Sequence, residues 1–249
     1  MSIEVLPDAE ALALRAADVF AMAAQAAAAA RGRFAAALSG GETPRALYRH
    51  LARQQFAQKV PWRRVLLYWG DERYVAPDDP ASNYGMAREA FIKHVPIAAE
   101  NVHRLQGESD PEAAALACEA ELRALAMLER PASEVPIFDL VILGLGRDGH
   151  TASLFPHSPA LDEEARFCVA TEAPDGSPRL TLTLPVINSA RRVMMLVSGA
   201  EKAGMVAEVL EGFRLPKAVP AQAIAPVKGQ LLWLLDEAAA AELGPAARG

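Results

Sequence analysis

Short apolar runs alternate along this chain with longer stretches in which apolar residues recur at helical spacing. The runs are bounded by glycine, proline or charged residues, which is typical of strands buried on both faces of a sheet. They occur at Phe34–Leu38, Val65–Trp69, Leu140–Leu143, Arg192–Val197 and Leu231–Leu235. This alternation predicts an α/β protein with a Rossmann-like three-layer fold, in which a mainly parallel central sheet carries helices on both faces.

The stretches between these runs contain recognisable helix starts and ends. Asp8 can cap a long alanine-rich helix that ends near Arg31, because a short polar side chain can accept from the free N–H groups of a first turn. Pro44 suits the first turn of a second helix. Further helices are expected from Ser82 or Asn83 to about Lys93, over Pro111–Leu128, from the 198–202 turn to about Leu210, and over Ala238–Ala241 in the tail.

Two further segments have strand character. Phe167–Ala170 is an apolar run, and Arg179–Leu184 alternates between apolar and polar residues, the pattern of a strand with unlike faces. No internal repeat or low-complexity linker interrupts the chain, so residues 1–249 are predicted to form a single domain.

Glycines and charged residues gather in the segments that follow the predicted buried strands. These segments are Ser39–Thr43, Asp71–Arg73, Gly144–His150 and Ser198–Lys202. If the strands are parallel, the segments lie along one edge of the sheet, and the carboxyl edge of an α/β sheet is where ligands bind. A ligand pocket is therefore expected there.

The Gly144–His150 segment carries an imidazole beside a carboxylate, His150 and Asp148, in a loop rich in glycine. This arrangement suggests that His150 is a general base, since the pKa of imidazole suits proton transfer near neutral pH. The same segment also fits GxGxxG, the dinucleotide fingerprint, with Glu172 as a possible ribose ligand. That alternative is disfavoured, because Pro156 would end the required helix too soon and Asp148 would lie near the pyrophosphate.

The other three segments have a functional and a purely structural interpretation. Gly40 and Gly41 before a helix can bind an anion through free N–H groups, but they also suit a simple tight turn. The charged residues Asp71–Arg73 are also typical of a solvated turn, and Lys202 is also typical of a solvated helix residue. On the residues alone these alternatives stay open.

Composition excludes several function classes. The chain has 249 residues, 52% of them hydrophobic, and a formal net charge of −6, which disfavours a broad surface for nucleic acid or acidic membrane. Cys118 and Cys168 are expected to be reduced thiols. The N-terminus lacks the pattern of a signal peptide, and Asp18 and Arg31 interrupt the most apolar helix, so a cytoplasmic protein without a membrane span is expected.

No motif indicates a metal or cofactor. His150 and His157 lack a metal-ligand spacing, and there is neither a GxxxxGK[ST] phosphate loop nor a GxSxG nucleophile elbow. Nothing in the sequence indicates an obligate protein partner.

The sequence resembles the 6-phosphogluconolactonases. The matching stretches are LSGGETP, WGDERYV with the following SNYGMA, LGLGRDGHTASLFP, RLTLTLP and SGAEKA. They are spread from Leu38 to Ala203, so the resemblance extends over most of the chain. The resemblance implies hydrolysis of 6-phospho-D-glucono-1,5-lactone, a small sugar phosphate lactone, to 6-phospho-D-gluconate. This is the second step of the oxidative pentose phosphate pathway and is expected here to need no metal or cofactor.

The resemblance also implies roles for the residues already singled out. His150 would take the proton from the attacking water, with Asp148 or Asp71 orienting its ring. Arg73 would hold either the phosphate or the developing oxyanion. The remaining phosphate contacts would come from Ser39, Gly40, Gly41, Thr43 and Lys202, with Arg179 as a further cation.

Two other functions remain as alternatives. A glucosamine-6-phosphate isomerase or deaminase of the same superfamily would carry an acidic residue just after the histidine, and Thr151–Pro156 contains none. Such enzymes also tend to carry an aromatic residue at the position of Arg73. A non-catalytic sugar-phosphate sensor would need a DNA-binding helix-turn-helix, for which the chain has no spare length.

Overall fold

The computed structural model describes residues 1–129 and 131–245, and its centre is a six-stranded sheet in which every pair of neighbouring strands is parallel. The strand order is β1-β9-β8-β5-β2-β3. The bounds are Ser2–Leu6 for β1, Phe34–Leu38 for β2, Val65–Trp69 for β3, Leu140–Leu143 for β5, Arg192–Val197 for β8 and Gln230–Asp236 for β9. The apolar runs of the sequence therefore form the central strands as predicted.

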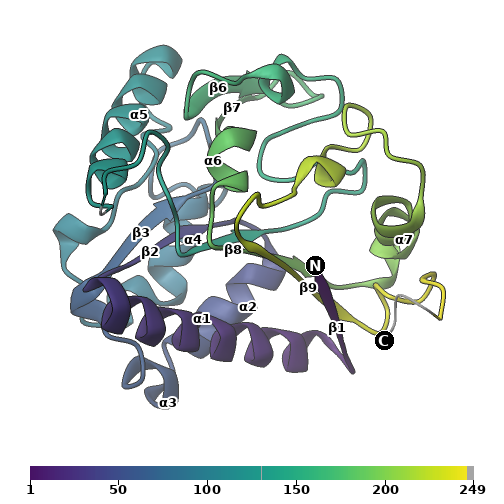
Figure 1. Ribbon diagram of the computed structural model, residues 1–249, viewed down its shortest axis with the longest axis horizontal. Coiled ribbons are helices and arrows are strands. Elements are labelled where there is room, and N and C mark those ends of the chain that lie inside the picture. The colour runs from purple at the N-terminus through teal and green to yellow at the C-terminus, as the bar shows by residue number, and fades with distance from the viewer. Residues whose placement is uncertain (130, 246–249) are drawn as a thin grey trace.

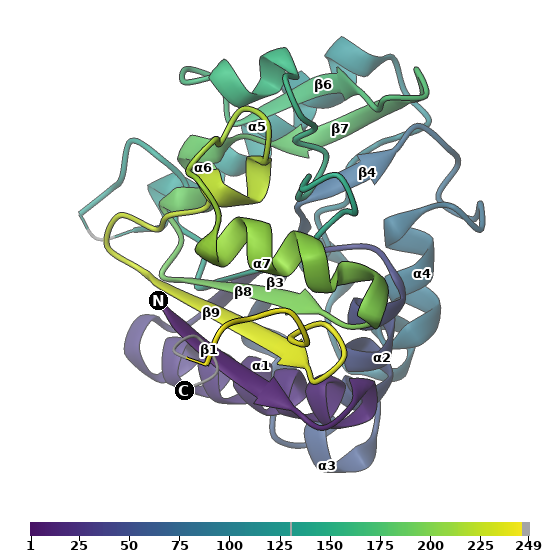
Figure 2. The same cartoon turned by 90° about the vertical axis from the view of Figure 1, so that its right-hand side faces the viewer.

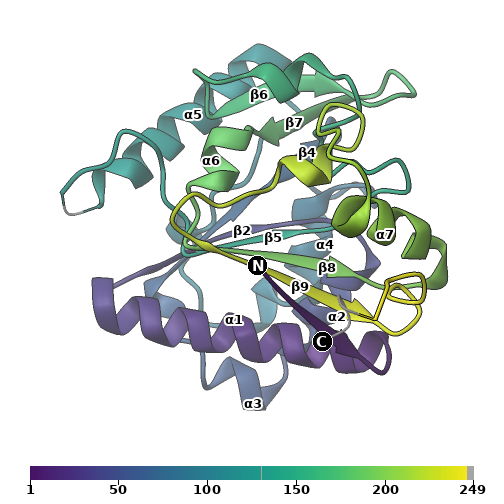
Figure 3. The ribbon, with the colours of Figure 1, turned by 45° about the vertical axis from the view of Figure 1, so that its right-hand side comes forward.

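Helices lie on both faces of this sheet, as Figures 1 and 3 show. One face carries α1 (Ala9–Arg31), α2 (Glu42–Leu51) and α3 (Gln54–Ala57), with α4 (Asn83–Ala90) packed beside α2. The other face carries α5 (Pro111–Met127), α6 (Leu184–Asn188) and α7 (Ala203–Glu211). Short 3₁₀ turns occupy Trp62–Arg64, Ile92–His94, Ala99–Asn101, Pro159–Asp162, Ala200–Lys202 and Pro220–Ala223. The predicted three-layer α/β fold is confirmed.

A second, antiparallel sheet lies on the same side of the central sheet as α5, α6 and α7 (Figure 2). The strand character predicted for Phe167–Ala170 and Arg179–Leu184 is confirmed, but their pairing in a separate sheet was not expected. Its strands are β4 (Asp71–Arg73), β7 (Pro178–Leu182) and β6 (Cys168–Glu172), in that order. The interpretation of Asp71–Arg73 as a loop is therefore wrong. Its backbone pairs with β7, with Arg73 opposite Arg179, a partner so remote in sequence that local patterning does not reveal it.

Three smaller predictions also need correction. β1 was not anticipated; it is an edge strand that pairs with β9, and none of its residues is fully buried. Residues 238–241 form turns instead of a helix. Helix α4 ends at Ala90, short of Lys93, and the chain continues in a 3₁₀ turn.

Helix α1 is a core helix. Asp8 caps it as predicted, accepting from the Ala11 N–H at 2.8 Å, and its Phe20 ring meets that of Phe34 on β2 edge-on at 5.1 Å. By length and composition this helix is able to cross a membrane, which the sequence analysis did not expect. More than half of the most apolar 18-residue stretch of this helix is buried inside the fold, which is typical of a helix that packs against a sheet.

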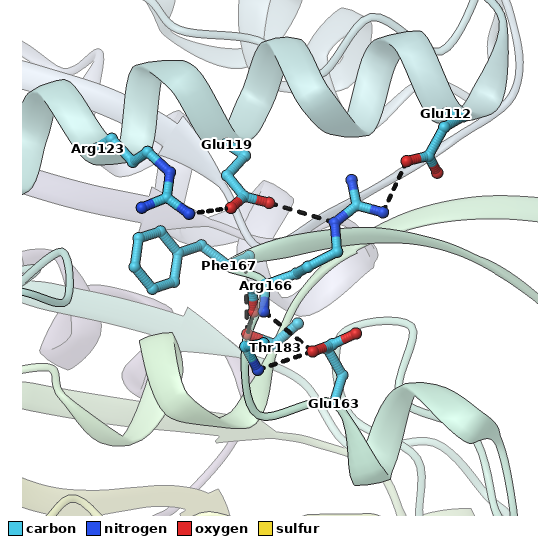
Figure 4. A network of polar contacts seen from close by, with 8 residues as sticks. Glu112, Glu119, Arg123, Glu163, Arg166, Phe167 and Thr183 are labelled. Atoms are coloured by element: carbon cyan, nitrogen blue, oxygen red, sulfur yellow. Dashed lines mark hydrogen bonds and ion pairs between the residues drawn. The ribbon is translucent and has the colours of Figure 1, made fainter.

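A network of ion pairs fastens the small sheet to α5 (Figure 4). Glu119 on α5 accepts from Arg123 at 2.6 Å and from Arg166, just before β6, at 3.3 Å, and Arg166 also reaches Glu112 at 2.8 Å. The Arg123 guanidinium lies 4.9 Å from the centre of the Phe167 ring. Because the Glu119 side chain is only 9% exposed, its pairing with both arginines is needed to offset the cost of burying its charge.

Candidate active site

A cavity of about 350 Å³ opens at the carboxyl edge of the central sheet. In Figure 2, β8 and β9 run toward this side, where α2 and α4 lie. Segments that follow β2, β3, β5 and β8 all contribute to its wall. The lining residues are Ser39, Gly40, Gly41, Asp71, Arg73, Asn83, Gly144, Leu145, Gly146, Arg147, His150, Thr151, Ala152 and Lys202. The segments expected to share one edge of the sheet therefore do meet.

A larger cavity, of about 430 Å³, lies where α2 and α4 face the 77–80 loop. Its wall contains arginines, acids and prolines, including Arg45 and Arg49, but no histidine, cysteine or serine that could act as a base or nucleophile. The smaller cavity is therefore the better candidate for catalysis, since it holds the histidine and lies at the ligand-binding edge of the sheet.

His150 and Asp148 form a close pair beside the cavity. The Nδ1 atom of His150 lies 2.5 Å from Oδ1 of Asp148, and the same oxygen accepts from the His150 backbone N–H at 3.2 Å. The ring packs against Phe155, with centroids 4.7 Å apart, and its side chain remains 33% exposed. Asp148 thus sets the ring orientation and leaves the other ring nitrogen free to face a ligand.

The charge of Asp148 is stabilised in this position. Burial by itself would raise the pKa of the Asp148 carboxyl, but the neighbouring His150 ring and its backbone N–H outweigh it, so the pKa lies below its ordinary value. A carboxylate that stays ionised favours a proton on Nδ1 and an unprotonated Nε2, which is the form that accepts a proton.

Gly146 makes room for this pair. A Cβ atom at this position would lie 2.1 Å from His150 Nδ1 and 2.5 Å from Asp148 Oδ1, closer than any real contact. The Gly146 N–H also donates to the His150 carbonyl at 2.8 Å and closes the loop. This glycine is required by the side chains packed against it, and not by a positive φ.

Asp71 does not contact the His150 ring by any hydrogen bond in the described part of the chain. Its carboxylate accepts from Ser153 Oγ at 2.7 Å and from Asn83 Nδ2 at 3.3 Å. Asn83 Nδ2 also donates to the Asp71 carbonyl at 2.9 Å, and a Cβ at Gly40 would lie 1.8 Å from Asn83 Oδ1. Asp71 therefore links the start of α4 to the loop that follows β5.

Glu72 anchors α4 to the wall of the cavity. Its buried carboxylate accepts from the N–H groups of Arg73, Asn83 and Tyr84 at 2.7–2.9 Å, and from Ser82 Oγ at 3.1 Å. Burial raises the pKa of Glu72, and the backbone N–H groups oppose that shift. A carboxylate at a helix N-terminus is also stabilised by the helix dipole.

The segment after β2 is held by a tyrosine. The buried Tyr48 hydroxyl accepts from the Ser39 N–H at 3.0 Å and donates to the Ser39 carbonyl at 2.8 Å. The Ser39 Oγ has no partner among the described residues. Gly41 precedes α2 with φ of 100°, a conformation that favours glycine, and supplies no side-chain cap. The first N–H groups of α2 are thus left for an anion.

Two cations of the cavity are fixed by backbone carbonyls. Arg73 Nη1 donates to Ala81 at 2.6 Å, and Lys202 Nζ donates to Leu145 at 2.8 Å. Burial is the main reason that the pKa of Lys202 lies below its ordinary value; Glu201 and Asp148 oppose the shift, and Arg147 adds to it.

The structure separates the predicted site residues into two groups. Ser39, Gly40, Gly41, Asp71, Arg73, His150 and Lys202 line the cavity. Asp148 supports it through His150, whereas Thr43 and Arg179 lie outside the lining, and Arg179 Nη1 donates to the Pro178 carbonyl at 2.9 Å. Among residues 1–129 and 131–245 there is no group of three or more His, Cys, Asp or Glu side chains that could hold a metal ion.

Three polar residues of the cavity wall, Asn83, Arg147 and Thr151, are not among the predicted site residues. Asn83 is expected from the sequence only as an alternative helix cap, and Ser82 fills that role by accepting from the Gly85 N–H at 2.9 Å. Arg147 lies within the glycine-rich loop and Thr151 directly follows it, and this position is the sequence signal for both.

Comparisons with known proteins identify the family of this chain. A protein-family profile described as glucosamine-6-phosphate isomerases/6-phosphogluconolactonase matches residues 7–233. The chain is 44% identical over 243 residues to a 6-phosphogluconolactonase of a Nostoc species, covering 97% of this chain and 98% of that protein. It is 45% identical over 249 residues to one of Mycobacterium tuberculosis, with the same coverage of each.

A solved structure is similar over the same extent. The 6-phosphogluconolactonase of Trypanosoma brucei superposes with a TM-score of 0.83 at 29% identity, covering 98% of each chain. With the family profile matching most of its length, this chain belongs to the glucosamine-6-phosphate isomerase/6-phosphogluconolactonase family.

Proposed function

We propose that this protein hydrolyses 6-phospho-D-glucono-1,5-lactone to 6-phospho-D-gluconate in the cytoplasm, the second step of the oxidative pentose phosphate pathway. The observation that carries the proposal is the His150–Asp148 pair beside a cavity that also holds Arg73 and Lys202. The full-length similarity to the Nostoc and mycobacterial lactonases supports the same reaction.

His150 acts as the general base. Its Nε2 takes a proton from water while the water oxygen attacks the lactone carbonyl carbon. The C–O bond to the ring oxygen then breaks, and the imidazolium returns the proton to that oxygen. Such assistance accelerates a reaction by about 10²–10⁴-fold. Asp148 holds the ring in the required tautomer and stabilises the imidazolium.

The order of the strands suggests how the substrate lies. Lys202 follows β8 and Arg73 follows β3, and β5 and β2 lie between these two strands. At about 4.8 Å per strand, three spacings separate the two strand ends by roughly 14 Å, so the cations serve different parts of the substrate. We assign Lys202 and the free N–H groups at the start of α2 to the phosphate, whereas Thr43, which lies outside the cavity wall, receives no substrate contact.

Arg73 then remains for the carbonyl oxygen, where it stabilises the negative charge that develops as water attacks. Arg179 receives no substrate contact in this arrangement, because it lies outside the cavity wall. Asp71 serves as a positioning residue that holds Asn83 and Ser153.

One assay tests the proposal. Freshly prepared 6-phosphogluconolactone and, separately, glucosamine 6-phosphate are supplied to the purified protein in the presence of a chelator, and each rate is compared with the spontaneous rate. Consumption of the lactone alone above the blank is the expected result. Consumption of glucosamine 6-phosphate would favour the deaminase function, and binding without turnover would favour a sensor.

A further inference from the structure

Arg147 is the one arginine of the glycine-rich loop after β5, and it lines the same cavity as Lys202. The two residues come from neighbouring strands, because β5 pairs directly with β8. The Lys202 ammonium donates to the carbonyl of Leu145, two residues before Arg147. Two cations are thus brought together on one side of the cavity.

Arg147 has no protein partner in the part of the chain that the structure describes. Residue 147 is exposed, and within residues 1–129 and 131–245 its guanidinium forms no ion pair or side-chain hydrogen bond. The adjacent carboxylate, Asp148, is already bonded to His150. Glu201 forms no ion pair with either cation within the described ranges, so no acid neutralises Arg147.

We infer that Arg147 is a specificity-determining residue which, together with Lys202, binds the phosphate group of the substrate. The inference rests on the proposed function and deepens it. A guanidinium presents parallel N–H donors to phosphate oxygens, while an ammonium binds as a point charge, so the pair suits a phosphate dianion better than a single carboxylate. Burial is the main cause of the lowered pKa of Lys202, and repulsion by Arg147 adds to it. A dianion bound between the two cations relieves that repulsion.

Arg147→Gln tests the inference, with Arg63→Gln as the matched control. Arg63 is an exposed arginine just before β3, at the opposite end of that strand from the cavity, so its loss changes the net charge equally. The ratio of kcat/KM for 6-phosphogluconolactone to that for unphosphorylated gluconolactone should fall about tenfold in Arg147→Gln, the effect of losing one charge-assisted hydrogen bond. The ratio should stay at the wild-type value in Arg63→Gln, and Arg147→Lys should recover part of the loss.

Calorimetry with 6-phosphogluconate and with gluconate separates this inference from the proposed function. Weaker binding of the phosphorylated acid alone in Arg147→Gln supports the inference even if the wild type shows no lactonase activity, an outcome that would reject only the proposed function. An unchanged ratio and unchanged binding in an active enzyme overturn the role of Arg147 alone. Equal loss for both acids, or no binding of 6-phosphogluconate by the wild type, also overturns it.

Discussion

His150 Nδ1 lies 2.5 Å from Asp148 Oδ1, so one ring nitrogen is engaged by a carboxylate and the other is left for the substrate. We predict that His150→Ala lowers kcat for the lactone by about 10²–10⁴-fold, the usual contribution of a general base. The melting temperature should change little, because the side chain is partly exposed. His94→Ala, at an exposed histidine, is the control, and a kcat near wild type in His150→Ala would place the base elsewhere.

The same pair predicts strong non-additivity. Asp148→Asn should lower kcat with little change in KM, because the amide no longer selects the tautomer that accepts a proton. Once His150 is replaced by alanine, the additional Asp148→Asn change should have almost no further effect. A double-mutant cycle on kcat measures this coupling, and independent effects would show that Asp148 acts otherwise than through the ring.

Gly146→Ala should impair catalysis without a large loss of stability. The added Cβ would lie 2.1 Å from His150 Nδ1, so the ring and Asp148 must move away from each other or from the loop. We expect kcat to fall at least tenfold, since catalytic geometry tolerates only small displacements. Gly204→Ala in α7, where the nearest atom to the new Cβ is 3.5 Å away, is the control. Equal kcat in both variants would contradict the expectation.

The lowered pKa of Lys202 predicts that ligand binding depends on pH. Its pKa lies below the ordinary lysine value, mainly through burial, with Glu201, Arg147 and Asp148 as the charged groups around it. The ammonium is present below that pKa and is lost as pH rises through it, so the affinity for 6-phosphogluconate should be highest at lower pH and should fall before an ordinary lysine would titrate. Lys202→Arg should abolish this alkaline loss and Lys202→Ala should weaken binding throughout, both measured by calorimetry from neutral to alkaline pH. If the Lys202→Arg variant lost affinity at alkaline pH as the wild type does, titration of Lys202 could not be the cause of that loss.

Glu72→Gln should destabilise the α4 side of the cavity. The carboxylate accepts from three backbone N–H groups and Ser82 Oγ, and a neutral amide offers a single acceptor oxygen. We expect a loss of about 1–3 kcal/mol in the free energy of unfolding, measured by urea denaturation. Glu100→Gln, at an exposed acid, should stay within about 0.5 kcal/mol of wild type. Equal stability of the two variants would show that Glu72 does not anchor the helix.

The order of apolar runs and turns along the chain was enough to predict the parallel core and the position of the site. Buried strands such as Leu140–Leu143 can be recognised in the sequence by their unbroken apolar residues. The segments that follow them can be recognised by their glycines and other turn-forming residues. The carboxyl ends of parallel strands lie at one edge of a sheet. The order of strands and loops along the chain was therefore enough to predict that Ser39, His150 and Lys202 line one cavity.

Features that depend on contacts between distant segments became visible only in the folded chain. β4 exists because Asp71–Arg73 finds β7 more than a hundred residues later, and no local pattern reports such a partner. The different roles of the two aspartates also depend on packing. Asp148 forms a hydrogen bond with the His150 ring, whereas Asp71 accepts from Ser153 and Asn83. Spacing along a chain limits which residues can share a site, but hydrogen bonds form only where the folded backbone brings donor and acceptor within about 3 Å.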